Sequence, residues 1–268
     1  MTKLPISVCM ISGAEASRIG GALSSVAGWT SEIIVVLNED VRDGTEEVAL
    51  AAGAKVFRER WKGHIAQKNS AADKAGQPWV LGLDADEAVS EALAAEIRSW
   101  LERPGAAEDT AAFSFPRCTL FGGRWIRHGD WYPDRQMRLW RRGSARWGGI
   151  DPHDKLIVNG PTRRLKSDLL HYSGASIDGQ IAKISSYSDD FVRAWREGRA
   201  RSGPLDLAFR PLWRFFRGYF LRLGFLDGWQ GYYIAWMTAF HSATRHAKVR
   251  LERQSVRTVG DSSGGKRS

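Results

Sequence analysis

The chain has few cysteines and no long apolar run. Its 268 residues include two cysteines, Cys9 and Cys118, too few for a disulfide framework and too far apart for a compact zinc motif. No stretch reaches the roughly 18 consecutive apolar residues of a membrane-spanning helix. The N-terminal "MTKLPISVCMISG" lacks a small-residue cleavage site. We therefore expect a cytoplasmic protein whose first apolar run is a strand.

Several catalytic signatures are also missing. The sequence contains no G-x-x-x-x-G-K-[ST] phosphate loop, G-x-G-x-x-G fingerprint, G-x-S-x-G elbow or H-E-x-x-H pair. It does carry an excess of positive charge, with 39 Lys and Arg against 30 Asp and Glu and a net charge of +9. This excess indicates an anionic partner, and composition leaves nucleic acid, a phosphate-rich substrate and a membrane surface open.

Residues 5–101 alternate between two patterns. Short apolar runs predict strands at 5–11, 32–37, 54–57 and 79–83, and amphipathic stretches predict helices at 15–28, 43–53, 64–76 and 90–101. Such alternation is typical of βαβ units, so we predict an α/β fold with a mostly parallel sheet flanked by helices. Ligands bind beyond the carboxyl ends of parallel strands, so residues 12–15, 38–45 and 84–87 are expected to lie close together.

The pattern changes along the rest of the chain. Shorter strand candidates continue to about residue 173, and from about residue 176 the sequence is helical, with arginines and aromatic residues alternating. We predict a catalytic domain over residues 1–175, a basic, aromatic helical extension over 176–253 and a disordered tail over 254–268.

The segment "WVLGLDADE" (79–87) runs from a buried strand into an acidic turn. Asp84 and Asp86 flank one residue, and carboxylates so placed can share a divalent cation with substrate phosphates. Alternatively, these acids decorate the start of the next helix, whose dipole favours negative charge there. Ser90 is the expected N-cap of that helix, which places its start too late for this alternative.

Three segments, "EIIVVLNEDVRDGTEEVALAAGAKVF", "WKGHIAQKNSAADKA" and "WVLGLDADE", together resemble the inverting nucleotide-sugar glycosyltransferases of family 2. The chain looks most like the branch that builds lipopolysaccharide core and related surface glycans. The resemblance implies a GT-A-like (Rossmann-like) fold, a nucleotide-sugar donor, above all a UDP-sugar, a lipid-linked glycan acceptor, and Mg²⁺ or Mn²⁺. "DADE" matches the family's DXD motif, so Asp86 would bind the metal, and Asp84 the donor ribose or the metal's water shell.

The resemblance assigns further donor residues. Lys68 lies where the family keeps a basic residue against the donor; otherwise it would be a solvated helix lysine. Glu15 matches the glutamate of an Asn-Glu turn whose asparagine is Ala14 here. Leu37 or Asn38 replaces the aspartate that usually ends the second strand, and this departure leaves the donor base open.

The stretch "WYPDRQMRLWRRGSARWGGIDPHDKL" (131–156) resembles the family's acceptor side, which ends in His followed by an acid. Inverting transfer needs a carboxylate that takes the proton from the acceptor hydroxyl. Asp154 matches that acid, and Asp151 is the second candidate. Without the resemblance, Asp154 would be read as a surface residue beside Lys155.

Three more side chains are candidates. His171 ends the last strand candidate, and in related enzymes a late histidine completes the metal site, which neutral imidazole can do. Arg138 and Arg135 could hold the diphosphate, since guanidinium pairs bidentately with phosphate oxygens. The two arginines fit a solvated strand face equally well.

Residues 207–253 carry Arg210, Arg214, Arg217 and Arg222 among aromatic and apolar residues. A basic amphipathic helix indicates a membrane-surface element, and each such charge near an anionic leaflet contributes about 1 kcal/mol. The alternative is a helical cap packed on the core. No nucleic-acid motif accompanies the charge, so we expect an anionic membrane surface rather than nucleic acid, with the protein peripheral on the inner face of the cytoplasmic membrane.

Two other functions compete with this one. A sugar nucleotidyltransferase also holds metal and nucleotide with carboxylates, but it forms the sugar nucleotide rather than consuming it. A non-catalytic protein that binds membrane or nucleic acid through the basic region is the second. The sequence leaves open the sugar, the acceptor position and the oligomeric state.

Overall fold

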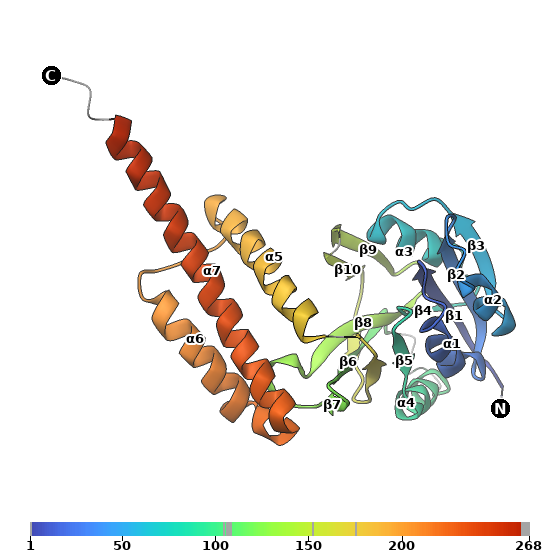
Figure 1. Ribbon diagram of the computed structural model, residues 1–268. Coiled ribbons are helices and arrows are strands. Elements are labelled where there is room, and N and C mark those ends of the chain that lie inside the picture. Colours follow the sequence, from blue (N-terminus) through green and yellow to red (C-terminus); the bar gives the residue numbers. More distant parts are fainter. Residues whose placement is uncertain (1, 104, 106–108, 152, 175, 264–268) are drawn as a thin grey trace. The chain divides into compact units, whose positions relative to one another are not determined.

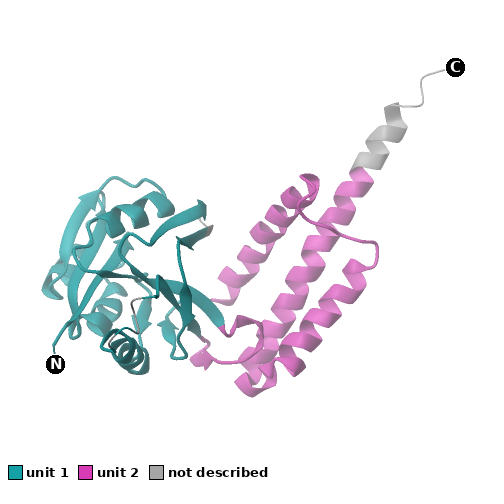
Figure 2. Ribbon diagram, turned by 180° about the vertical axis from the view of Figure 1, so that it is seen from behind, with its two compact units in different colours: residues 1–119, 134–173 teal, residues 120–133, 174–268 magenta. Residues whose placement is uncertain are grey.

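A computed structural model of the protein describes residues 2–103, 105, 109–151, 153–174 and 176–263. The chain divides into two compact units (Figure 2). The first combines residues 1–119 with 134–173, and the second combines residues 120–133 with the chain from 174 onward.

The first unit is built around a mixed sheet (Figure 1). Its strands are β1 (Leu4–Ser12), β2 (Thr30–Asn38), β3 (Lys55–Glu59), β4 (Trp79–Gly82), β5 (Glu87–Val89), β6 (Ala112–Phe121), β8 (Asp134–Arg141), β11 (Thr162–Arg164) and β12 (Leu169–His171). The order is β3-β2-β1-β4-β8-β6-β12-β5, with β11 also beside β6. Strands β3, β2, β1 and β4 are parallel, whereas β8 runs antiparallel to both β4 and β6.

Each face of the sheet has its own apolar core. The covering elements are α1 (Ile19–Ala27), α2 (Thr45–Ala51), α3 (His64–Asp73), α4 (Glu91–Leu101) and the hairpin β9 (Ala145–Ile150)–β10 (His153–Val158). One core joins β1 and β2 to α1, α2 and α4, as Val8, Leu23 and Ile97 illustrate. The other joins the sheet to α3 and the hairpin through Ala71 and Trp147. The predicted α/β fold with a mostly parallel sheet flanked by helices is confirmed.

The strand register brings the candidate segments to one sheet edge. Ser12 of β1 lies beside Leu37 of β2, and Cys9 lies beside Gly82, the last residue of β4. Because these strands are parallel, their carboxyl ends meet at the same edge. The segments that follow them therefore begin next to one another, as the sequence predicts.

The second unit is helical. Its elements are β7 (Arg124–Ile126), a 3₁₀ turn (Gly129–Trp131), α5 (Ile177–Arg196), α6 (Asp206–Phe216), a π-helical turn (Arg217–Leu221), a second 3₁₀ turn (Gly224–Asp227) and α7 (Gly228–Ser263). Helix α7 lies between α5 and α6 (Figures 1 and 2) and packs against both. The ring of Phe215 on α6 lies 5.0 Å from that of Trp236 on α7. No helix in the described ranges is both long and apolar enough to span a membrane.

The division of the chain differs in two ways from the predicted boundaries. The segment 120–133 belongs with the helices, because Asp130 pairs with Arg217 at 2.5 Å and Asp227 accepts hydrogen bonds from the backbone N–H groups of Arg127 and His128. Helix α7 continues beyond residue 253 to Ser263, and in this stretch, "QSVRTVGDSS", only Gln254 and Arg257 are good helix formers. Residues 264–268 lie outside the described residues, so disorder there stays a prediction.

Candidate functional site

The acidic turn follows β4 and precedes a strand, not a helix. Glu87 begins β5, and α4 begins only at Glu91, where Ser90 accepts a hydrogen bond from the N–H of Leu93 as its N-cap. Asp84 and Asp86 therefore do not lie at the N-terminus of a helix. The N–H of Asp84 donates to the buried carboxylate of Glu87 at 3.1 Å, so Glu87 holds the turn in shape.

Lys68 on α3 joins two of the candidate acids. Its ammonium nitrogen Nζ lies 3.0 Å from Oδ1 of Asp84 and 3.0 Å from Oδ2 of Asp154 on β10. The side chains of Lys68 and Asp154 are only 11% and 14% exposed. Low exposure strengthens the attraction between opposite charges, so Lys68 is a bridge between the turn and the hairpin.

Arg138 holds the turn from the other side. One register position is skipped between β8 and β6, with Phe113 opposite Leu139 but Ser114 opposite Met137. Arg138 is the extra residue of this bulge, and bulges re-aim side chains. Its Nη2 donates to Asp84 Oδ2 at 2.5 Å and to Glu87 Oε1 at 2.9 Å.

The charges around Asp84 set its ionisation. Burial alone would raise the pKa of its carboxyl group, but the positive charges of Arg138 and Lys68 outweigh this and hold the pKa well below its usual range. Burial would likewise lower the pKa of Arg138, and the charges of Asp84 and Glu87 raise it instead. Both groups are therefore charged throughout the physiological range.

Lys68, Asp84, Glu87, Arg138 and Asp154 together form a charge cluster. The ring of Trp147 of β9 packs against its two cations. The ring lies 4.7 Å from the Lys68 ammonium and 5.4 Å from the Arg138 guanidinium, distances typical of cation–π contacts. Asn69 fixes the strand by exchanging two hydrogen bonds with the Trp147 backbone. Gly82 makes the approach possible, because a Cβ there would lie 2.9 Å from the Trp147 ring.

Asp86 and His171 form a second pair beside the first. Antiparallel pairing of β5 with β12 places His171 opposite Glu87, and its Nε2 lies 3.4 Å from Oδ2 of Asp86. Burial would raise the pKa of Asp86, but His171 lowers it overall. The other ring nitrogen, Nδ1, lies 3.2 Å from the hydroxyl of Thr119. The hydrogen bond that lowers the pKa of Asp86 is donated by Nε2–H to its carboxylate. A metal at Nε2 would replace that proton and leave Nδ1–H to donate to the Thr119 hydroxyl.

These donors fit a divalent metal in part. Asp86 and His171 offer one carboxylate oxygen and one imidazole nitrogen, and the hydroxyl of Thr119 can fix the histidine tautomer, as the second shell of a metal site does. Both oxygens of Asp84 are instead engaged by Lys68 and Arg138. No group of three metal-ligating side chains gathers among the described residues. A metal here would therefore need phosphate oxygens and water as its remaining ligands, which Mg²⁺-type ions accept.

The other predicted residues lie outside the charge cluster. Glu15 follows β1 and pairs with Arg18 at 2.6 Å, and the charge of Arg18 in turn lowers the pKa of Asp86. Asn38 ends β2, and its buried Oδ1 has no hydrogen-bond partner within the described ranges. Arg135 donates instead to the carbonyl of Leu165 at 3.0 Å.

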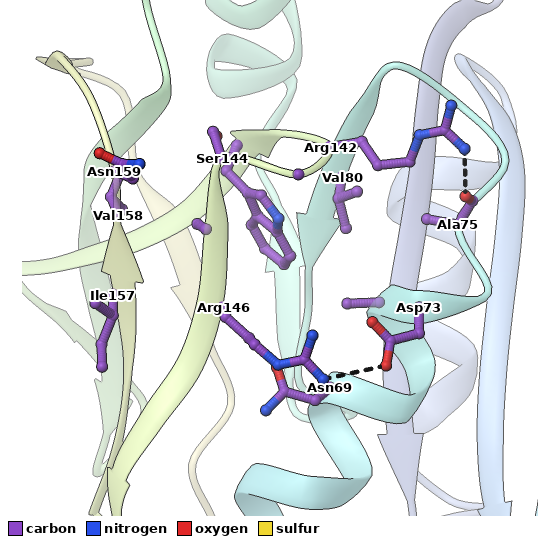
Figure 3. Close-up of a pocket in the computed structure, with 14 residues that line it drawn as sticks. Asn69, Asp73, Ala75, Val80, Arg142, Ser144, Arg146, Ile157, Val158 and Asn159 are labelled. Carbon is purple, nitrogen blue, oxygen red and sulfur yellow. Dashed lines mark hydrogen bonds and ion pairs between the residues drawn. The ribbon is translucent and has the colours of Figure 1, made fainter.

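The hairpin and α3 also line two cavities in the first unit. One of about 500 Å³ lies between Asn69 and Asp73 of α3 and residues 142–146 and 157–159 (Figure 3). Another of about 660 Å³ reaches Asp151, whose carboxylate accepts the N–H of Ile65 at 3.0 Å. Asp151 thus lies on the cavity side, whereas Asp154 lies in the charge cluster.

Sequence reasoning missed the supporting residues. Arg117 binds Glu87 at 3.3 Å and Asp134 at 2.7 Å and belongs to no motif, and Trp147 lies in the acceptor-side stretch without having been assigned a role. A weak signal for Trp147 was its position between an arginine and two glycines, because small neighbours leave room for a large ring.

Known proteins resemble this chain along most of its length. The model of Glycosyl transferase family 2 matches residues 7–162. The chain is 29% identical over 254 residues to an uncharacterized glycosyltransferase of Rickettsia typhi, covering 91% of this chain and 86% of that protein. It is 27% identical over 259 residues to the lipopolysaccharide core biosynthesis glycosyltransferase LpsC of Rhizobium meliloti, covering 91% and 94%.

Solved structures show a more distant likeness. S. aureus TarS 1-349 in complex with UDP-GlcNAc gives a TM-score of 0.45 at 13% identity, covering 93% of this chain and 92% of that 1-349 chain. Glucosyl-3-phosphoglycerate synthase from Mycobacterium tuberculosis, in complex with Mg²⁺ and UDP, gives 0.43 at 15% identity, covering 74% and 81%. Both scores lie below 0.5, so the relationship rests on the sequence matches.

Proposed function

Since the chain belongs to glycosyl transferase family 2, we propose that it moves a sugar, with inversion and with the help of a divalent metal, from a nucleoside diphosphate donor to a lipid-linked glycan of lipopolysaccharide core or a related surface polysaccharide. The observation that carries this proposal is the bridge of Lys68 between Asp84 and Asp154. It joins a candidate donor-binding acid to a candidate base in one partly buried cluster.

Asp154 is the proposed base. Its carboxylate would take the proton of the acceptor hydroxyl while the hydroxyl oxygen attacks the anomeric carbon. In the structure this carboxylate is paired with Lys68 at 3.0 Å. A diphosphate in the cluster would attract the same ammonium group, and the Asp154 carboxylate would then be free to accept a proton. Asp151 is the weaker candidate, because it lies outside this cluster.

Lys68, Arg138 and Asp84 are proposed to bind the donor. The two cations would contact diphosphate oxygens, and Asp84 would orient the ribose or a metal-bound water. Asn38 and Glu15 are proposed to line the base and ribose region, and the buried, unpartnered Oδ1 of Asn38 leaves an acceptor for a base N–H group. A UDP-sugar is the first donor to test.

Asp86 and His171 are the residues that would hold Mg²⁺ or Mn²⁺. Their separation of 3.4 Å between Oδ2 and Nε2 supports this assignment. When bound, the cation would stabilise the negative charge that develops on the departing diphosphate. The chain's own Lys68 and Arg138 would stabilise the same charge from the other side.

A lipid-linked acceptor would place the protein at the inner face of the cytoplasmic membrane. Helix α6 has no buried side chain, and Phe209, Leu212 and Trp213 on it are 64%, 69% and 55% exposed. An apolar helix face flanked by arginines is typical of helices that lie in a membrane surface. These exposed apolar side chains support membrane docking of α6.

Donor hydrolysis tests this proposal. UDP-, GDP- and ADP-sugars are incubated in turn with the full chain and Mn²⁺, and release of the nucleoside diphosphate is measured. We expect slow hydrolysis of one donor class that requires the metal. Formation of a sugar nucleotide from a sugar phosphate and a nucleoside triphosphate would identify a nucleotidyltransferase instead, and hydrolysis of none would contradict the donor assignment.

A further inference from the structure

The arginines of the basic, aromatic segment differ in their partners. Arg217 and Arg222 both pair with Asp130, at 2.5 and 3.2 Å, and Arg210 pairs with Asp206 at 2.8 Å. These three charges are thus compensated within the second unit. Arg214, half-buried on α6, has no acidic partner among the residues that the structure describes.

Arg245 of α7 is a second uncompensated guanidinium. It is half-buried, its guanidinium lies 4.8 Å from the ring of Phe191 on α5, and its Nε has no hydrogen-bond partner among the described residues. Burial lowers its pKa, and the charges of Arg214 and Arg210 lower it further. The nearest charges on α6 are therefore mainly repulsive, with Asp206 as the opposing acid.

Polar groups on the adjoining turns of α7 are also unsatisfied. Ser242 and His246 are each 2% exposed, and within the described part of the chain their Oγ and Nε2 atoms lack partners, as does Nε2 of His241. Burial and the charge of Arg245 lower the pKa of both histidines. The other ring nitrogen of His246 is satisfied by Ser202 at 2.9 Å, which leaves Nε2 as the open position.

These uncompensated guanidinium groups and unsatisfied polar atoms destabilise the helical unit unless a bound anion pairs with them. Buried charges without a partner and buried polar atoms without hydrogen bonds both cost free energy. A phosphate group is the anion that matches two guanidinium groups, because its oxygens accept their paired N–H groups. Hydroxyl and imidazole groups can supply further hydrogen bonds to the same oxygens.

The surroundings indicate where this phosphate comes from. Phe209, Trp213 and Phe216 on α6 are exposed by 64%, 55% and 46%, and Arg210 and Arg214 lie on the flank of this apolar stripe by helical periodicity. A soluble phosphate would need no such apolar border. A lipid head group would bring acyl chains to it.

We infer that Arg214 and Arg245, with His241, Ser242 and His246, form a binding site for the phosphate group of an anionic lipid head group. The inference deepens the membrane part of the proposed function and rests on it. In place of four equivalent surface arginines, it assigns one site on α6 and α7, where Arg245, His241 and His246 also contact aromatic rings of α5.

Vesicle binding by the full chain tests the site. Vesicles of phosphatidylcholine alone are compared with vesicles that also contain phosphatidylglycerol, for wild type, Arg214→Gln and Arg245→Gln. Arg250→Gln is the matched control, because it removes the same charge from an exposed position of α7. We expect each of the first two substitutions to weaken binding more than about tenfold, because each removes charge-assisted hydrogen bonds to the phosphate. The control should lose no more than about fivefold, the loss that diffuse attraction gives. Equal losses in all three variants would overturn the site in favour of diffuse attraction.

Two further measurements keep the result interpretable. Because repulsion is relieved, Arg245→Gln should unfold at no lower denaturant concentration than wild type, and a large loss of stability would overturn the uncompensated-charge reasoning. Inorganic phosphate is the soluble probe. If it shifts the imidazole NMR signals of His241 and His246 while phosphatidylglycerol vesicles do not, the lipid source is wrong. A dimer that covers α6 in place of vesicle binding would also overturn it.

The donor reaction separates this inference from the proposed function. Arg214 and Arg245 lie in the helical unit, so metal-dependent donor hydrolysis without lipid should be the same in both variants as in wild type. Loss of vesicle binding with unchanged hydrolysis supports the lipid site. Equal loss of hydrolysis would show that the substitutions act on the fold, and the site would then be rejected.

Discussion

Replacing Lys68 by methionine removes the charge that joins Asp84 to Asp154 and keeps an apolar stem over Trp147. The ammonium lies 3.0 Å from each carboxylate, and the Lys68 side chain is only 11% exposed. Removing one partner of a buried ion pair costs about 3–5 kcal/mol. Arg138 still compensates Asp84, so we expect the lower part of that range, about 3 kcal/mol of unfolding free energy, measured by urea denaturation at neutral pH.

Lys55→Met is the matched control. Lys55 pairs with Glu32 at a similar 2.8 Å, but its side chain is 66% exposed, and exposed pairs contribute about 0.2–1 kcal/mol. Adding Asp154→Asn to Lys68→Met should restore part of the loss, because the unpaired carboxylate is then neutral. If the two lysine variants lose the same free energy, or the double variant recovers nothing, the Lys68 bridge does not stabilise the fold as reasoned.

Two more predictions concern the base and the acid range. Asp154→Asn should abolish sugar transfer while donor affinity, measured by titration calorimetry, stays within about twofold; normal turnover would remove Asp154 as the base. Burial would raise the pKa of Glu59, but hydrogen bonds from Lys62, Lys74 and Ser70 outweigh this and lower the pKa to about 2. Its folded pKa is thus below the unfolded value, so this stabilisation is complete above about pH 4.5 and is lost toward pH 2. Urea denaturation of Glu59→Gln should show a smaller loss of stability between neutral pH and about pH 3 than wild type, and an equal loss would contradict this.

The order of strands and helices in the first half of the chain could be read from the sequence. Apolar runs that end at Leu37 and Leu83, separated by amphipathic stretches, have the two periodicities of buried strands and covering helices. The general position of the acidic turn followed, because strand ends in a parallel sheet lie at one edge. Lys68, which lies on a helix, was proposed with Asp84 only through the resemblance to the family.

The contacts that complete the candidate site could not be read in this way. Lys68 and Asp154 are 86 positions apart, and only the packing of β9–β10 on α3 brings them together. The bulge that directs Arg138 toward Asp84 depends on a register shift, which hydrophobic periodicity does not encode. From the sequence, Arg135 and Arg138 were equally good candidates for binding the diphosphate. In the structure Arg135 instead donates to the carbonyl of Leu165.

The boundary of the helical unit shows a second kind of limit. The stretch around Phe121 and Trp131 lies between strands in the sequence, but its rings pack with α7, where Phe121 stacks 5.8 Å from Tyr233. Pairing between segments so far apart depends on side-chain shape and charge rather than on local pattern. Side-chain pairing also changes the membrane-surface prediction. Asp130 compensates Arg217 and Arg222, whereas Arg214 has no ion pair among the described residues.

Binding of UDP tests the central claim most directly. Titration calorimetry of the full chain is carried out with Mn²⁺, with excess chelator, and with Asp86→Asn in Mn²⁺. The account predicts binding that requires the metal and that weakens about tenfold or more in the variant. If UDP binds equally well in excess chelator and to Asp86→Asn, the turn "DADE" does not hold a metal-bound nucleotide, and the proposed donor site is wrong.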